Sequence, residues 1–183
     1  MAYYYFDFRD VKKQDCYGLV TSLVSQLSAE SDSCYNVLSN LYSDNSHGMR
    51  KPDIGALKKC LVDMLSLPGQ EPIYIIVDAL DECPNFPRMP SARENVLEFI
   101  KEIVNLKLPN VNLCAASRPE VDIRLALEPL TTLKISLHDE IGQKNDIVEY
   151  INSVVHSDRS MRRWKEDDKQ LVVETLSGKA DGM

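Results

Sequence analysis

Residues 73–82 read Ile73-Tyr74-Ile75-Ile76-Val77-Asp78-Ala79-Leu80-Asp81-Glu82, and this run sets the class of fold. Five consecutive apolar residues, rich in β-branched side chains and bounded by Pro72 and an acid, are typical of a strand covered on both faces. Sheets of parallel strands bind their ligands at the carboxyl ends of the strands. We therefore expect a parallel sheet, with Asp78 at the edge where binding or chemistry takes place.

Three carboxylates follow this strand in close succession. A carboxylate at the position of Asp78 can hold Mg²⁺ through the coordinated waters of the ion, because magnesium prefers octahedral oxygen ligands. Asp81 and Glu82, one turn further on, can orient or activate a water molecule that attacks a phosphate. The plainer alternative is that Asp78 ends the strand and the other two acids cap the following turn.

Aromatic and amphipathic patterns predict the elements that precede this run. Ala2–Phe8, rich in Tyr and Phe, is expected to form a short strand. Asp15 and Asp53 each stand ahead of apolar residues at helical spacing, which indicates the N-caps of two helices. Ser43–Gly48 is a turn-forming cluster and indicates an exposed loop ahead of the second helix, which Pro68-Gly69 ends.

The same alternation continues after the acidic run. Ser91 and Glu94 form a capping-box pattern ahead of a helix. Val111–Ala116 is expected to be another buried strand, followed by the polar turn Ser117–Glu120 and a short helix. Leu133–Leu137 adds one more short strand. Strands and helices in alternation predict an α/β fold with a mainly parallel sheet.

Composition excludes several classes of function. The 183 residues carry 21 Lys and Arg against 28 Asp and Glu, a formal charge of −7. Nucleic acid is not expected as a partner, because it needs a concentrated basic face and we interpret the short Met161–Lys165 run as a solvated helix face. Five scattered cysteines without C-x-x-C spacing indicate reduced thiols in a cytoplasmic protein. The apolar runs are strand-sized and no signal peptide pattern is present, so no membrane span is expected.

A second polar strand end, Ser117-Arg118-Pro119, completes a pair of motifs. Alone it is an ordinary turn, although an Arg at this place can contact a γ-phosphate with its fork of donors. Together with Asp78–Glu82, it resembles the Walker B and sensor 1 segments of the NACHT branch of the STAND P-loop NTPases, especially the fungal and nephrocystin-3-like N-terminal members. That branch has a small residue after the metal-binding Asp and acids three and four positions on, as in this sequence.

Three further segments agree with the resemblance, which covers nearly the whole chain. Phe6–Arg9 looks like the second strand of the family, Asn145–Ile151 like the helix after its last core strand, and Lys179–Met183 like the start of its Lys-Ala-Asp-Gly-Met-Phe signature. The resemblance implies a P-loop NTPase-type parallel sheet flanked by helices over residues 1–138. Residues 139–183, which have helical apolar spacing, are then the start of a helical subdomain.

The resemblance also implies a role for each polar residue at the strand ends. Asp78 is the expected ligand of Mg²⁺, and Asp81 and Glu82 are the expected catalytic acids at the attacking water. Ser117 and Arg118 are the expected nucleotide contacts. The nucleotide is ATP or GTP, and the parent protein is a signalling switch that contacts other domains of its own chain and forms a homo-oligomer on activation.

The phosphate loop of this family, G-x-x-x-x-G-K-[ST], is absent from the sequence. Gly178-Lys179 is the only Gly-Lys pair, but Val173 stands in place of the first glycine and Ala180 in place of the hydroxyl residue. By the resemblance the loop belongs ahead of Tyr3 and the helical signature stops short at Met183. We therefore expect the chain to be a fragment, a mispredicted gene product or a truncated domain.

The missing loop has consequences for the sheet and for binding. In the family, the missing strand lies between the fourth and fifth strands, so the strand near Leu113 is expected to lose a neighbour. The strand near Leu133 then pairs with it directly or sits loosely. Mg²⁺ binding by Asp78 alone is weak, so we expect no saturable ATP binding at micromolar concentration and no turnover.

Two other interpretations remain open. The chain is alternatively a degenerate module that keeps the fold as a protein-interaction surface and hydrolyses nothing. A different α/β hydrolase that uses Asp78 and Asp81 is a weaker interpretation, because the sequence has no G-x-S-x-G elbow and none of its cysteines stands out as a nucleophile.

Overall fold

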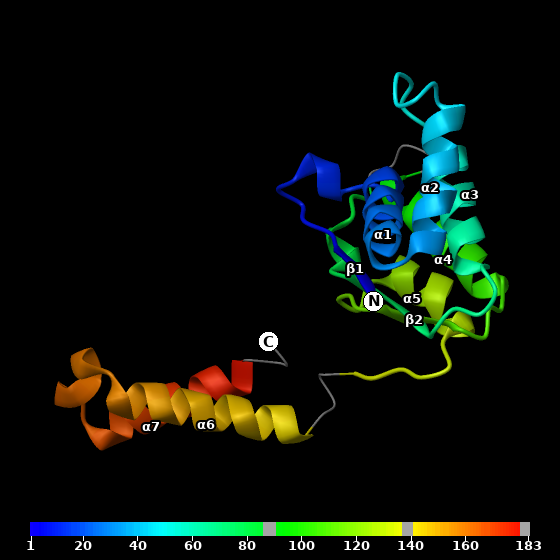
Figure 1. The fold of residues 1–183 in the computed structure, drawn as a ribbon. Helices are drawn as coiled ribbons and strands as arrows, with labels where there is room; N and C mark the ends of the chain where they lie inside the picture. The colour runs from blue at the N-terminus through cyan, green and yellow to red at the C-terminus, as the bar shows by residue number, and fades with distance from the viewer. Residues whose placement is uncertain (86–90, 137–140, 180–183) are drawn as a thin grey trace. The chain divides into compact units, whose positions relative to one another are not determined.

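A computed structural model describes residues 1–85, 91–136 and 141–179, with the backbone alone for 141–144. The chain forms two compact units, Met1–Thr131 and Thr132–Met183, and each is described by itself. Figure 1 shows the elements of both units.

A three-stranded parallel sheet forms the centre of the first unit, in the order β1-β2-β3. Its strands are β1 (Ala2–Tyr5), β2 (Ile73–Asp78) and β3 (Val111–Ala115). The register pairs Tyr5 with Asp78 and Val77 with Ala115, so all three strands end at the same edge. The predicted α/β fold with a parallel sheet is therefore confirmed.

Five α-helices accompany the sheet. They are α1 (Cys16–Glu30), α2 (Asp32–Asp44), α3 (Ile54–Leu65), α4 (Ala92–Asn105) and α5 (Val121–Leu127), with short 3-10 segments at Val11–Lys13, Leu80–Glu82 and Glu128–Leu130. The three predicted caps are present, because Asp15 and Asp53 accept hydrogen bonds from first-turn amides and Ser91 closes a capping box with Glu94. In Figure 1, α1, α2 and α3 lie side by side.

The helices bury one face of the sheet. Ile75 and Val77 of β2 lie under Leu19 of α1 and Phe99 of α4, and both strand residues are 1% exposed. Tyr74, which points to the opposite face, is 53% exposed. Within the first unit, none of the described helices packs on the face of Tyr74, so the expectation that β2 is covered on both faces is wrong there.

Helix α2 is not among the elements expected from the sequence. Ser31 caps this helix by accepting a hydrogen bond from the Cys34 amide at 3.4 Å. Cys34 is its one buried residue, but Val37, Leu38 and Leu41 recur with it at helical spacing and pack against the core, so the sequence held a helix pattern that was missed. The predicted loop over Ser43–Gly48 is confirmed only after Asp44, where α2 ends.

Two helices, α6 (Ile141–Ser157) and α7 (Glu166–Lys179), pack together in the second unit, joined through the 3-10 segment Arg159–Arg163. Val155 and Val173 are the buried residues of this pair. The apolar spacing of this segment predicts a buried face of Leu171, Val172 and Leu176 in α7. That prediction is partly wrong, because Leu171 and Leu176 are exposed while Val173 is covered.

Residues 132–136 of the second unit form no strand, so the prediction of one at Leu133–Leu137 is wrong there; Leu137 itself lies outside the described residues. Leu133 and Ile135 are 76% and 66% exposed, so the described residues bury neither side chain as a core strand would be buried. Lys179 ends α7, and the rest of the predicted signature also lies outside the described residues.

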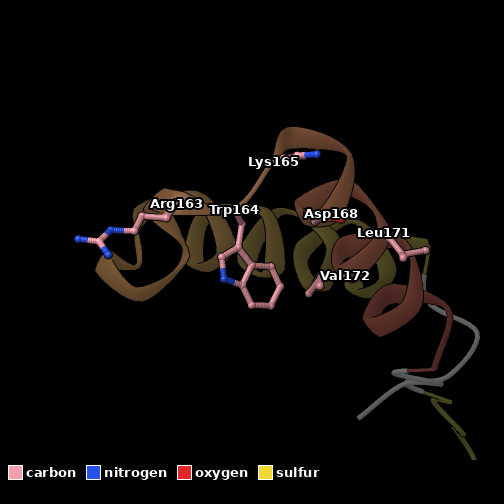
Figure 2. Close-up of a pocket in the computed structure, with 6 residues that line it drawn as sticks. All are labelled: Arg163, Trp164, Lys165, Asp168, Leu171 and Val172. Carbon is pink, nitrogen blue, oxygen red and sulfur yellow. The ribbon is translucent and has the colours of Figure 1, made fainter.

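A shallow hollow lies beside the indole of Trp164 in the second unit (Figure 2). It is lined by Arg163, Trp164, Lys165, Asp168, Leu171 and Val172. Both basic side chains point away from the indole in Figure 2 and are exposed, which agrees with a solvated basic run. None of the helices in the described ranges is long and apolar enough to cross a membrane.

Candidate functional site

Asp78 ends the central strand at the carboxyl edge of the sheet, and its side chain is exposed. Its Oδ1 accepts a 2.8 Å hydrogen bond from the backbone N–H of Ala79. Ala79 has φ 52° and ψ 44°, a left-handed conformation that turns the chain sharply out of the strand. A small side chain suits this position because larger and β-branched residues adopt the left-handed region at a greater cost.

Buried Leu80 anchors the turn that follows Asp78. Its side chain is 0% exposed, and its amide donates to the carbonyl of Ala116 at 3.1 Å. This bond connects the ends of β2 and β3 directly. The acids on either side of Leu80 are therefore presented from a fixed backbone.

Asp81 faces the tip of β3. Its side chain is 11% exposed, and its Oδ1 accepts a 3.0 Å hydrogen bond from the backbone N–H of Arg118. Its Oδ2 lies 3.5 Å from Nε of the same arginine. The guanidinium of Arg118 is otherwise open to solvent, with 79% of the side chain exposed. The structure thus brings together one predicted catalytic acid and the predicted phosphate contact.

Glu82 faces the other side, toward the end of β1. Its Oε2 accepts a 3.2 Å hydrogen bond from the backbone N–H of Phe8. The side-chain amide of Gln14 holds the carbonyl of Phe8 at 2.6 Å, so the loop after β1 is fixed in turn. Ser117 stays within its own turn, where its Oγ donates to the carbonyl of Arg118 at 2.9 Å.

Asp7 adds a fourth acid near this edge, in the loop after β1. Its Oδ1 accepts hydrogen bonds from the backbone and the Nε of Arg9, at 2.9 Å and 3.1 Å. These bonds lower the pKa of the Asp7 carboxyl and raise that of the Arg9 guanidinium. The edge therefore carries exposed arginines on both sides of the acidic turn.

Arg93 is the residue of this site that sequence reasoning missed. It is 8% exposed on α4, and its guanidinium donates to the carbonyls of Cys83 at 2.9 Å and Asp81 at 2.6 Å. Its Nη1 also contacts both carboxylate oxygens of Asp122 on α5, at 3.3 Å and 3.2 Å. The available signal was its helical spacing with apolar Leu97 and Ile100, which puts an arginine on the buried face of α4.

The edge offers few ligands for a metal ion by itself. Within the described residues, no group of three or more His, Cys, Asp and Glu side chains is arranged to hold one. Asp81 and Glu82 each accept a hydrogen bond from the backbone amide of another loop, whereas Asp78 accepts one from its own turn. One carboxylate supplies only part of the six contacts that Mg²⁺ requires, so phosphate and water would supply the others.

The fold and this edge define an α/β protein with a parallel sheet whose carboxyl edge is acidic. Residues 1–118 match the family described as Nephrocystin 3, N-terminal, and the chain belongs to that family. The match includes all three strands and extends to Arg118. Neither the curated proteins nor the solved structures contain a significant match to the chain.

Proposed function

We propose that this chain is the magnesium-and-water side of a NACHT-type nucleotide switch, a cytoplasmic signalling ATPase or GTPase in its intact form. The observation that supports this most directly is the placement of Asp78. It ends the central strand, it is exposed, and two acids and an arginine from adjacent turns lie at the same edge. Parallel sheets bind ligands at this edge.

The contacts suggest a different role for each of the three acids. Asp78 holds Mg²⁺, which neutralises charge on the β- and γ-phosphates when it is bound. Both oxygens of Asp81 face Arg118, so Asp81 orients that arginine. Glu82 accepts a hydrogen bond from the Phe8 amide, and its carboxylate keeps the capacity to accept one from a water molecule. We therefore place Glu82 at the attacking water and Asp81 in support.

Arg118 is suited to contact the terminal phosphate. Its backbone is fixed by Asp81 while most of its side chain is exposed, so the guanidinium can turn to a ligand without moving the turn. Ser117 shapes that turn through its bond to the carbonyl of Arg118. A planar guanidinium binds phosphate oxygens with two parallel hydrogen bonds, which makes it a specific reporter of the γ-phosphate.

Manganese relaxation tests the metal position directly. Mn²⁺ and inorganic triphosphate, added at millimolar concentration to the ¹⁵N-labelled chain, should broaden the amide signals of Ala79, Phe8 and Arg118. Asp78→Asn should abolish the broadening, and Asp44→Asn at the end of α2 is the matched control. If the Asp78→Asn chain broadens the same signals as the unmodified one, the assignment of Asp78 is wrong.

Nucleotide binding is expected to need the phosphate loop. MgATP and MgGTP should give no saturable binding to this chain at micromolar concentration, because one carboxylate and one arginine make few of the required contacts. Translation of the genomic region ahead of the chain should reveal an in-frame G-x-x-x-x-G-K-[ST]. A longer chain that includes this loop should hydrolyse nucleotide, and Glu82→Gln should stop hydrolysis while binding remains.

The alternative function is a degenerate module that uses the same fold to bind proteins. The open sheet face with exposed Tyr74 favours it, because exposed aromatic side chains are common in interfaces. A longer chain without a phosphate loop, and with no Mn²⁺ effect at Ala79, would support this alternative over the switch.

A further inference from the structure

Arg93 of α4 holds the acidic turn after β2 at three points. Its Nη2 donates to the carbonyl of Asp81 at 2.6 Å, its Nε to that of Cys83 at 2.9 Å, and its backbone N–H to that of Pro84 at 3.1 Å. Glu82 therefore lies between two carbonyls that one guanidinium holds. Arg93 is 8% exposed, so water has little access to replace these contacts.

Asp122 connects this guanidinium to the turn that carries Arg118. Both carboxylate oxygens of Asp122 accept from Nη1 of Arg93, at 3.3 Å and 3.2 Å. Asp122 lies in the first turn of α5, and just ahead of it the Glu120 amide donates to the carbonyl of Arg118 at 2.8 Å. Since Asp81 also accepts from the Arg118 amide, the contacts form a closed ring that runs through Arg93.

An arginine contributes a fixed geometry in this enclosed place. The loss of hydration of a buried charge offsets much of the free energy that its contacts contribute, so an ion pair such as Arg93–Asp122 is weak evidence for a purely stabilising role. The guanidinium differs from other side chains of its size in its planar fork, which fixes the directions of several acceptors at once. Here those acceptors belong to the two turns that carry Glu82 and Arg118.

We propose that Arg93 is a positioning residue, which holds Glu82 in place for the attacking water and couples it, through Asp122, to Arg118 at the terminal phosphate. The inference rests on the proposed function, which assigns Glu82 and Arg118 to those places. Arg93 contacts no phosphate itself, because its side chain is turned into the protein and is 9% exposed. A displacement of the Arg118 turn by phosphate is passed to Glu82 through this buried pair.

Amide hydrogen exchange of the ligand-free chain measures whether Arg93 holds the turn. The Phe8 amide donates to Glu82 and the Arg118 amide to Asp81, so the exchange rate of each amide reports on one acid. Arg93→Lys keeps the charge but lacks the planar fork. It should accelerate exchange at both amides about tenfold, the equivalent of one lost hydrogen bond. A rate at Phe8 equal to that of the unmodified chain would overturn the proposal.

A matched control separates positioning from a general loss of stability. Val24 is 2% exposed in α1, and Val24→Ala leaves a cavity in the core without changing any residue of these turns. It should accelerate exchange of the β2 amides, which open with the whole sheet, and leave Phe8 and Arg118 unchanged, because loop amides exchange through local opening. If Val24→Ala accelerates exchange at Phe8 as much as Arg93→Lys does, the role of Arg93 is merely structural.

Asp122→Asn tests the coupling between the two turns. In the described residues the Asp122 carboxylate accepts hydrogen bonds from Arg93 and Asn85, and from neither Phe8 nor Glu82. The substitution should accelerate exchange at Phe8 in the unmodified chain and add nothing in the Arg93→Lys chain. Glu120→Gln, at an N-cap whose side chain makes no cap hydrogen bond, should have no effect in either chain. Equal effects of Asp122→Asn in both chains, or none in either, would refute the coupling.

Mn²⁺ with inorganic triphosphate separates this inference from the proposed function. Asp78 accepts its hydrogen bond from Ala79 and not from Arg93, so the Arg93→Lys chain should still show metal-induced broadening at Ala79 although exchange at Phe8 is faster. Broadening at Ala79 with no change of exchange at Phe8 would refute the positioning role alone. Faster exchange at Phe8 with no broadening in the unmodified chain would refute the nucleotide site, and with it the role of Arg93 there.

Discussion

The backbone amide of Arg118 donates a 3.0 Å hydrogen bond to Oδ1 of Asp81, which joins the tips of two adjacent strands across 37 positions of sequence. The side chain of Asp81 is nearly buried, whereas that of Arg118 is exposed. The carboxylate of Asp81 therefore fixes the backbone of the turn, while the exposed guanidinium of Arg118 stays able to contact a ligand. A structural contact and a proposed nucleotide contact share the same two residues.

Asp81→Ala should destabilise the first unit by about 1 kcal/mol, because it removes the acceptor of the Arg118 amide and the contacts of a side chain that is only 11% exposed. Asp81→Asn keeps an acceptor of the same shape and should cost less. Urea denaturation followed by circular dichroism measures both changes. Asp63→Ala removes an exposed carboxylate on α3 and should change the free energy of unfolding by less than about 0.5 kcal/mol.

Arg93→Met should cost about 3 kcal/mol, because it leaves the carbonyls of Cys83 and Asp81 without their donor and Asp122 without its partner. Arg93→Lys retains the charge but has no planar fork, so it should recover less than half of the loss. Denaturant unfolding measures these values, with Lys59→Met on α3, where the side chain is 76% exposed, as the control. Equal stability of Arg93→Met and the unmodified chain would show that this cluster does not stabilise the fold.

Ala79→Gly should stabilise the chain by about 0.5 kcal/mol, because φ 52° and ψ 44° strain any side chain while glycine adopts them freely. Ala79→Val should destabilise it by about 1–2 kcal/mol, since β-branched residues fit the left-handed region worst. Ala29→Gly in α1 is the matched control and should destabilise, as glycine does in helices. Urea denaturation measures the change in the free energy of unfolding, which should have opposite signs in the two glycine variants.

Local signals in the sequence predicted much of the fold. Asp15, Asp53 and Ser91 are caps whose hydrogen bonds close within three residues, so their helices were predictable without knowledge of the tertiary structure. The run ending at Asp78 likewise predicted the central strand and the edge at which it ends. Helix α2 carried a comparable signal, in the Ser31 cap and in Cys34, Val37, Leu38 and Leu41 at helical spacing, and that signal was missed.

The contacts within the candidate site were not predictable in the same way. Asp81 was expected at a water molecule, but no sequence pattern shows that the amide of Arg118 lies opposite it. The buried guanidinium of Arg93 depends on three segments that meet only after folding. The exposed face of Tyr74 was missed because a continuous apolar run does not reveal whether helices cover one face or both.

The contact between α6 and α7 should weaken as the pH rises past neutrality. His156 Nδ1 lies 2.8 Å from the carbonyl of Asn152 and Nε2 lies 2.7 Å from Glu166, so the protonated ring donates to both. The bond to the Asn152 carbonyl, and then that to Glu166, raise the pKa of His156 above its ordinary 6.5. The bonds from His156 and Lys169 lower the pKa of Glu166 below its ordinary 4.5.

The protonated ring therefore stabilises the pair fully below the ordinary pKa of His156, and this stabilisation is lost as the pH rises through the raised one. The stabilisation that the Glu166 carboxylate contributes is lost at the acid end, as the pH falls through its lowered pKa. Fluorescence of Trp164, the only tryptophan, reports the melting of this unit. The Tm of the α6–α7 unit should fall as the pH is raised from about 6 to about 9. The fall should disappear in His156→Gln and persist in His47→Gln; a fall that survives His156→Gln would assign the effect to another group.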